Sequence, residues 1–441
     1  MKEFEQRWTR QAAYALLGQT IGFFLDAYDL MFVTAMTPIL AKVLLPSKMP
    51  AWLAYFITLF GYVFTLIARP VGSALFGNYA DLIGRRNTLL YTLLGAGILS
   101  AVTAAIPTYA QVGIMAYIIF AILRFIEGIF IGGEYAAGHP PFALEQVPIK
   151  WRGLAGGIDQ SGFAWGVALG GAVVSVFYSW LGPSRMLAYG WRYVFLTGLI
   201  PAVVGFIIRL TLPESPVFEE IKEQGRLEKV PFFSLFSTRE RVLTFLQVML
   251  VMTGMFYCSW SMFNYFVGIV EGAGLSGGEA AFYYSMAGII DAISLIIWGL
   301  ISDFIGRRLG IITAGIGAVI MAIPSFYLLY IGAYTRNAAI LWLGTVLVGW
   351  FTNYVWGGVE PAYLTERFAT VRRGSGVGFG YSSGIFLSSP IMPFLSILLY
   401  PILHSMWMIA AIMLMIGGTL SAIGAYIGPE TKGVSLRAFS A

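Results

Sequence analysis

Three charged residues inside long apolar stretches are the first candidates for chemistry in this sequence. Asp26 and Asp29 lie three positions apart in one stretch, and Arg124 lies in another. Residues three apart share one face of a helix, and two neighbouring carboxylates in a low-dielectric environment do not both ionise easily. One of the two is therefore expected to hold a proton at neutral pH. We predict proton coupling at this pair, with simple pairing to a structural arginine as the alternative.

Arg124 is the expected counter-ion, because a permanently charged guanidinium at membrane depth needs a carboxylate. That carboxylate is Asp26, Asp29 or one carried by a substrate, and Glu127 is close enough in sequence to compete. We predict a switch in which an ionised aspartate holds Arg124 and protonation frees it to bind a substrate anion. A static salt bridge between helices is the alternative.

The apolar stretches that carry these residues define the class of protein. Of the 441 residues, 58% are hydrophobic and 11% are charged, whereas soluble proteins carry roughly 25% charged residues. The runs approach the ~20 residues that a helix needs to cross a bilayer, and they are continuous rather than alternating, which favours helices over barrel strands. We predict an all-α membrane protein with twelve transmembrane helices, near residues 14–38, 51–76, 87–106, 111–137, 154–180, 191–212, 242–270, 278–300, 309–331, 337–364, 376–400 and 405–427.

Lysine and arginine gather in the short loops on one side of the predicted spans. This excess predicts that the side is cytoplasmic and that both termini lie there. Residues 1–10 are polar and have no cleavage signature, so they indicate a cytoplasmic tail of a multi-pass cell-membrane protein rather than a signal peptide. The net charge of +5 belongs to these loops and does not indicate nucleic-acid binding.

A sequence repeat divides the chain into two halves. The stretch from Gly77 to Arg86 has a second copy from Gly299 to Arg308, and their aspartates are 222 positions apart (303 − 81). Residues at 140, 145 and 152–153 recur 221 positions later. Such a repeat predicts two pseudo-symmetric six-helix bundles, 1–212 and 241–441, joined by a charged cytoplasmic linker at 213–240.

The repeated loops predict a conformational latch between the halves. Their carboxylates are suited to accept hydrogen bonds from a helix N-terminus or to pair with an arginine; a positive-inside anchor without a gating role is the alternative. We expect Arg69 to be structural, with its side chain snorkelling to the nearby cytoplasmic end. The predicted gating residues are Asp81, Arg85, Arg86, Glu134, Glu145, Arg152, Asp303, Arg307, Arg308, Glu366 and Arg373.

With these loops in place, the chain resembles a transporter of the major facilitator superfamily over essentially its whole length. Further motifs resemble the metabolite:proton symporters and the sialate, lactate and phosphate symporter groups. They are Phe24-Leu-Asp26-Ala-Tyr-Asp29, Arg69-Pro70-Val-Gly72, Gly132-Gly133-Glu134-Tyr135, Trp191-Arg192 and Pro213-Glu214-Ser215-Pro216. Pro429-Glu430-Thr431-Lys432-Gly433 is also similar to sugar porters, but the glutamine pair of sugar porters is missing from the seventh span. The resemblance implies two bundles around a central cavity, with alternating access.

Further polar residues inside the spans are candidates for substrate contact. Gln160 aligns with a substrate-binding glutamine of sugar porters, and Asp29 aligns with their first-span aspartate. For each candidate, packing or hydrogen bonding between helices is the alternative role. The predicted substrate-binding residues are Arg124, Asp159, Gln160, Tyr257, Asn264, Asp291 and Glu360.

These patterns predict a secondary transporter and exclude several other classes. One cysteine and two histidines offer neither a disulfide nor a metal centre, and we find no nucleotide-binding loop and no nucleophile–base set. We expect no enzymatic activity, no metal and no cofactor, with the proton as coupling ion. We predict proton-coupled symport of a small organic anion, a carboxylate metabolite, by a monomer in the lipid bilayer. Phosphate or sugar symport is the alternative, ahead of a drug or metabolite exporter and a membrane sensor.

Overall fold

The computed structural model describes residues 8–83, 85–138, 144, 147–211, 236–353, 358–368, 373–434 and 436, and its regular structure over these ranges is helical. The first half contains α1 (Arg10–Ala35), α2 (Thr37–Leu44), α3 (Ala51–Ile83), α4 (Arg85–Thr103), α5 (Tyr109–Val112), α6 (Met115–Gly138), η2 (Ile149–Trp151), α8 (Arg152–Arg185), η3 (Met186–Gly190), α9 (Trp191–Thr197) and α10 (Leu199–Thr211). The second half contains α13 (Arg239–Phe263), α14 (Phe266–Gly272), α15 (Gly277–Ile305), α16 (Arg307–Tyr334), α17 (Ala338–Phe351), α19 (Glu360–Arg367), α20 (Arg373–Ser388), α21 (Ile391–Leu403) and α22 (Met406–Ile427).

The helices match the spans expected from the sequence. Among the described residues, nine helical stretches are long and apolar enough to cross a membrane, and shorter apolar helices cover Leu90–Thr103 and Ala338–Phe351. The stretch Ile149–Ile207 contains two spans, α8 and α9–α10. With this division and the two shorter helices, the nine stretches account for the twelve expected spans. The all-α membrane fold is confirmed. Most of the predicted linker lies outside the described residues.

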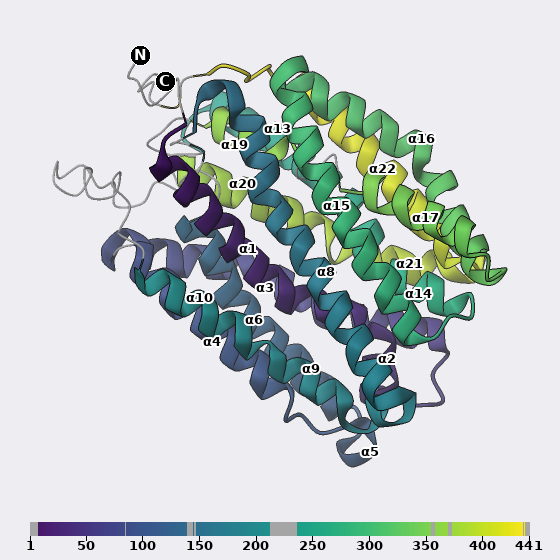
Figure 1. The fold of residues 1–441 in the computed structure, drawn as a ribbon. Coiled ribbons are helices and arrows are strands. Elements are labelled where there is room, and N and C mark those ends of the chain that lie inside the picture. The colour runs from purple at the N-terminus through teal and green to yellow at the C-terminus, as the bar shows by residue number, and fades with distance from the viewer. Residues whose placement is uncertain are drawn as a thin grey trace.

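The two halves lie side by side, with α8 of the first half against α15 of the second along the middle of the molecule (Figure 1). Glycines bring these two backbones together. A Cβ atom on Gly157 would lie 2.5 Å from the Leu295 carbonyl oxygen, and one on Gly171 would lie 2.8 Å from the Ala281 oxygen. Small residues permit such close approach between helices. The α8–α15 pair therefore forms a seam between the halves.

Local sequence explains where several helices begin and break. Thr9 caps α1 by accepting a hydrogen bond from the Ala12 amide at 3.0 Å, and Ser276 forms a capping box with Glu279 at the start of α15. The first span of each half is broken: α1 ends before Met36, and α13 ends before Asn264.

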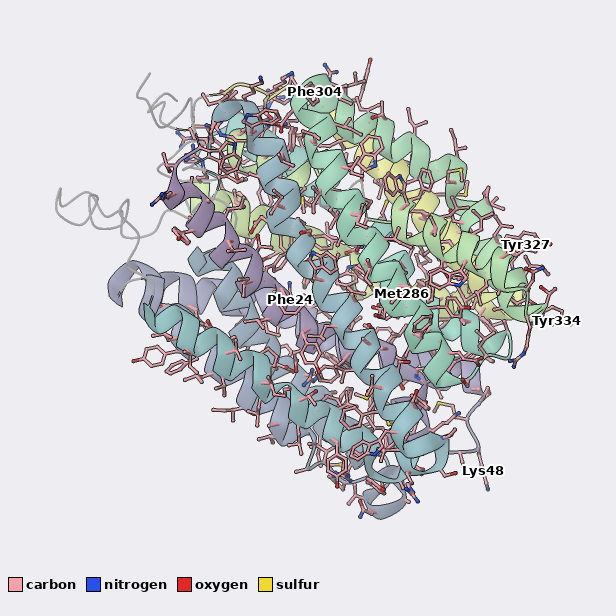
Figure 2. All side chains as sticks on the ribbon, in the orientation of Figure 1. Phe24, Lys48, Met286, Phe304, Tyr327 and Tyr334 are labelled. Atoms are coloured by element: carbon pink, nitrogen blue, oxygen red, sulfur yellow. The ribbon has the colours of Figure 1, made fainter. Side chains whose placement is uncertain are left out.

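The outer surface carries apolar side chains, as lipid contact requires. Large exposed examples include Tyr91, Ile98, Ile200, Ile207, Ile316, Ile320, Ile323 and Phe394. Figure 2 labels Phe304 near one end of the molecule and Lys48 near the other. Below, the end that contains Arg152, Asp303 and Glu366 is called the Glu366 end, and the end that contains Tyr55 and Gly278 is called the Tyr55 end.

Candidate functional site

A buried ion-pair cluster lies within the first half. The carboxylate of Asp29, on α1, meets the guanidinium of Arg124, on α6, with Nη1 and Oδ2 separated by 3.4 Å. Nη2 of Arg124 lies 2.5 Å from Oε2 of Glu127, one turn further along α6. Asp29 is 8% exposed, and the other two are fully buried. Of the carboxylates that the sequence offered for Arg124, the described contacts include Asp29 and Glu127.

Neighbouring helices of the same half complete this cluster. Ser100 on α4 donates a hydrogen bond to the second carboxylate oxygen of Asp29, and Thr103 accepts one from Arg124 at 3.3 Å. The rings of Phe120 and Phe195 lie 5.9 and 5.4 Å from the guanidinium carbon. All of these partners come from the first half. Among the described contacts, Arg124 therefore faces the interior of its own bundle rather than the second half.

Asp26, the other predicted proton carrier, has its backbone in α1, and its side chain lies outside the described residues. The same holds for the side chains of five predicted gating residues: Asp81, Arg85, Arg86, Glu134 and Glu145.

A second polar group joins the two halves and is called the inter-half cluster: Arg69 on α3, Asp159 and Gln160 on α8, Glu360 on α19 and Tyr381 on α20. All five are at most 5% exposed. The carboxylates of Asp159 and Glu360 interact electrostatically. The hydroxyl of Tyr381 interacts with Arg69, Gln160 and Glu360. Three of the predicted substrate-binding residues, Asp159, Gln160 and Glu360, are thus linked, and Tyr381 connects them to Arg69.

Several polar atoms of this cluster have no hydrogen-bond partner within the described part of the chain. They are both carboxylate oxygens of Glu360 and Nε of Arg69. The Tyr62 hydroxyl, which interacts electrostatically with Arg69, also has no hydrogen-bond partner among the described residues. Buried polar groups are normally satisfied, so this cluster is chemically incomplete and suited to hold a polar ligand.

The remaining substrate-binding candidates have other described contacts. Asp291 accepts a hydrogen bond at 2.6 Å from Asn353, within the second half. The backbone oxygen of Asn264 accepts a hydrogen bond at 2.7 Å from the Tyr55 hydroxyl. Tyr257 packs in the main hydrophobic core.

The orientation expected for Arg69 was wrong. We expected its side chain to snorkel to the cytoplasmic end, but it is only 5% exposed. The physical reason is the length of α3, which continues to Ile83 rather than ending near 76. At 1.5 Å per residue, Arg69 lies about 21 Å from that helix end, beyond the reach of its side chain. Its counterpart 222 positions later is Asp291, a signal that the repeat offered. Ser100, Tyr62 and Tyr381 carried no comparable signal.

A charged network holds the halves together at the Glu366 end. Asp303 accepts hydrogen bonds from the backbone amides of Gly153 and Leu154 at the start of α8, both at 2.8 Å, which places a carboxylate at a helix N-terminus. Arg307 lies 2.8 Å from Asp303 and 3.2 Å from Glu366. The halves are thus joined by side chain to backbone contacts as well as by charge.

Two further arginines contribute to the same network. Arg152 lies 3.7 Å from Glu366 and donates to the Val434 oxygen at 2.6 Å. Arg373 donates to the Thr365 and Leu436 oxygens, at 3.0 and 2.9 Å. Burial raises the pKa of Glu366, beyond the end of the tenth span, while the neighbouring Arg307 and Arg152 act in the opposite direction.

Arg308 lies beside this network rather than between the halves. It donates to the Tyr426 oxygen on α22 at 2.6 Å, and its backbone amide donates to Glu430 at 3.1 Å. A surface pocket of about 310 Å³ lies at the same end of the molecule, lined by Ile149, Lys150, Trp151, Asp303, Phe304, Lys432 and Gly433.

Contacts also join the halves at the Tyr55 end. The rings of Trp52 and Tyr400 stack with centroids 5.0 Å apart, and the hydroxyls of Thr34 and Tyr284 lie 2.9 Å apart. Ser175 donates to the Gly278 oxygen at 3.0 Å. Together with the network around Glu366, these contacts describe a conformation in which the halves meet at both ends.

Comparisons with known proteins agree with this architecture. The family model described as Major Facilitator Superfamily matches residues 19–353. The chain is 30% identical to the inner membrane metabolite transport protein YhjE of Escherichia coli (strain K12) over 388 residues, which cover 87% of this chain and 86% of the relative. It is 25% identical to the shikimate transporter of the same organism, covering 96% of this chain and 95% of that one.

A solved structure has the same fold. The proton:xylose symporter XylE superposes on this chain with a TM-score of 0.72 and 22% identity, covering 96% of this chain and 97% of that one.

Proposed function

We propose that this chain, which belongs to the Major Facilitator Superfamily, is a secondary active transporter that couples the inward movement of a small organic carboxylate to protons. It is a multi-pass membrane protein and not an enzyme. The observation that carries the proposed coupling is the ion pair between Asp29 and Arg124 inside a membrane-spanning bundle.

The charges of this cluster support a role in proton binding. The cluster contains two acids, Asp29 and Glu127, and one cation, Arg124. One uncompensated negative charge at membrane depth costs several kcal/mol, and one bound proton removes it. Protonation of Asp29 would release its contact with Arg124, while Glu127 continues to hold the guanidinium. We include Asp26 in the proposed proton site on the sequence argument alone.

The proposed transport cycle alternates between the two sets of inter-half contacts. Breaking the Asp303 and Glu366 contacts would open the Glu366 end, and breaking the Tyr55 and Trp52 contacts would open the other. The proposed substrate lies between them, at the inter-half cluster. We place the Glu366 end in the cytoplasm on the distribution of Lys and Arg, and we propose a monomer without a cofactor.

Uptake into proteoliposomes tests the coupling. The purified protein is given an inward proton gradient and one labelled compound at a time: shikimate, N-acetylneuraminate, lactate, proline, xylose or phosphate. We expect uphill accumulation of at least one carboxylate. We expect Asp29→Asn to abolish accumulation but to retain exchange of substrate across the membrane, because asparagine mimics the protonated acid. Glu279→Gln, at an exposed acid, serves as the control.

Two results would decide against the proposal. If Asp26→Asn and Asp29→Asn both left proton-driven accumulation intact, coupling at this site would be wrong. If only xylose or only phosphate accumulated, the substrate class would be wrong. Arg124→Gln is expected to lower anion uptake strongly.

A further inference from the structure

The inter-half cluster contains two acids and one cation. Arg69 supplies one positive charge, and Asp159 and Glu360 supply two carboxylates, all at most 5% exposed. None of the ion pairs within the described residues includes Arg69 or Glu360. A buried charge is retained only when it is paired or when it is neutralised. A ligand that brings a positive group to Glu360 and a negative group to Arg69 would satisfy both.

A simple carboxylate fits this charge pattern poorly. Two buried acids that interact do not both ionise easily, so one ionised acid balances Arg69, and a bound carboxylate would leave the cluster with one net negative charge. The acids also come from opposite halves, Asp159 from α8 and Glu360 from α19, so the ionised acid lies at the boundary between the halves. A cationic group placed between them would be attracted to that acid, whereas an added anion would be repelled.

Aromatic rings border the same region. The ring of Tyr62 packs edge-on against Trp260 at 5.6 Å, Trp260 stacks on Phe256 at 5.8 Å, and Phe256 meets Tyr381 at 4.9 Å. The two ends of this row, Tyr62 and Tyr381, both interact with Arg69. Tyr381 also interacts with Glu360, and ring faces attract ammonium groups once water is excluded, so this end of the row supports an ammonium group beside Glu360.

The unpartnered groups add hydrogen-bonding capacity for the same ligand. The Tyr62 hydroxyl belongs to a residue that is 1% exposed, and it has no hydrogen-bond partner in the described part of the chain. Arg69 provides a planar donor group of the kind that binds carboxylates with two hydrogen bonds. The cluster therefore presents both donors and acceptors to a ligand.

We propose that the inter-half cluster binds a zwitterion, a small molecule with a carboxylate for Arg69 and an ammonium group for Glu360 and Asp159. This inference rests on the proposed transport function and narrows its substrate from organic carboxylates to amino-carboxylates. Tyr381, which interacts with both Arg69 and Glu360, lies between the two ends of the ligand.

Binding of isosteric pairs tests the proposal. Proline is paired with cyclopentanecarboxylate, and trimethylglycine with 3,3-dimethylbutyrate, so that each pair differs in a charged nitrogen replaced by carbon. Titration calorimetry on the purified protein at pH 7 gives the ratio of dissociation constants. We expect at least one zwitterion to bind roughly tenfold or more tightly than its carbon isostere, the size set by one interaction with a buried carboxylate.

Three variants assign the preference to residues. Glu360→Gln is expected to bring the ratio close to one, and Arg69→Gln to weaken both members of a pair. Glu279→Gln, an exposed acid at the Tyr55 end, is expected to leave the ratio unchanged. Equal or tighter binding of the carbon isosteres, binding of neither zwitterion, or an unchanged ratio in Glu360→Gln would each overturn the proposal. If Glu360→Gln does not fold, the ratio of dissociation constants measured for the wild-type protein decides alone.

The uptake assay separates this inference from the proposed function. Proton-driven accumulation of the carbon isosteres without binding of zwitterions would retain the transporter and reject the zwitterion. Tight zwitterion binding without proton-driven accumulation would retain the binding site and reject the coupling.

Discussion

Replacement of Arg124 by methionine tests the charge arrangement inside the first half. The guanidinium lies between Asp29 at 3.4 Å and Glu127 at 2.5 Å, and both acids are buried. Arg124→Met would leave two carboxylates without their cation. Removing one partner of a buried ion pair costs about 3–5 kcal/mol. By contrast, Glu127→Gln keeps the pair with Asp29 and removes the excess acid, so its cost is expected to stay within about 1–3 kcal/mol.

The assay is thermal unfolding of the purified protein in detergent, followed by tryptophan fluorescence at pH 5 and pH 8. The loss in Arg124→Met is expected to be smaller at pH 5, because protonation removes the uncompensated charges. Adding Glu127→Gln to Arg124→Met should recover part of the stability, since one orphaned carboxylate disappears. Equal losses for Arg124→Met and Glu127→Gln, or a larger loss at pH 5, would refute this reasoning.

Two further predictions concern contacts between the halves. Asp303→Asn weakens the acceptor of the Gly153 and Leu154 amides, so it should open the Glu366 end and speed maleimide labelling of a Gly156→Cys probe; unchanged labelling would contradict the proposed latch. Gly157→Val places a side chain where a Cβ would already lie 2.5 Å from the Leu295 oxygen, so overpacking should lower stability by about 1–3 kcal/mol, measured by thermal unfolding. Gly156→Ala, whose Cβ would lie 3.2 Å from Pro361, is its matched control.

The sequence was sufficient for the fold because apolar run length and internal repetition are direct consequences of the bilayer. The runs define the spans, since backbone groups in lipid must be paired within a helix. That Arg124 needs a carboxylate was also predictable, because a charge at that depth needs a partner, but the sequence did not choose between Asp26 and Asp29. Both inferences rest on the free-energy cost of placing unpaired backbone groups or charges in lipid. That cost applies to any arrangement of the helices.

What the sequence left open depends on which face of each helix meets another. Arg69 was misassigned because span length was judged from hydropathy, while α3 continues through a polar segment to Ile83. Asp159 and Asp291 are both buried acids, yet one lies between the halves and the other is bonded to Asn353 within its own half. Hydropathy does not distinguish these faces, because both are shielded from lipid.

The glycine contacts of α8 and α15 have a mechanical consequence. Backbones that touch near Gly157 and again near Gly171 have no compressible side-chain layer between them. The pair can therefore act as a fulcrum, about which separation at one end of the molecule presses the other end together. In such an arrangement, the Glu366 end and the Tyr55 end could not be open at the same time. This coupling would follow from the geometry of the helices alone.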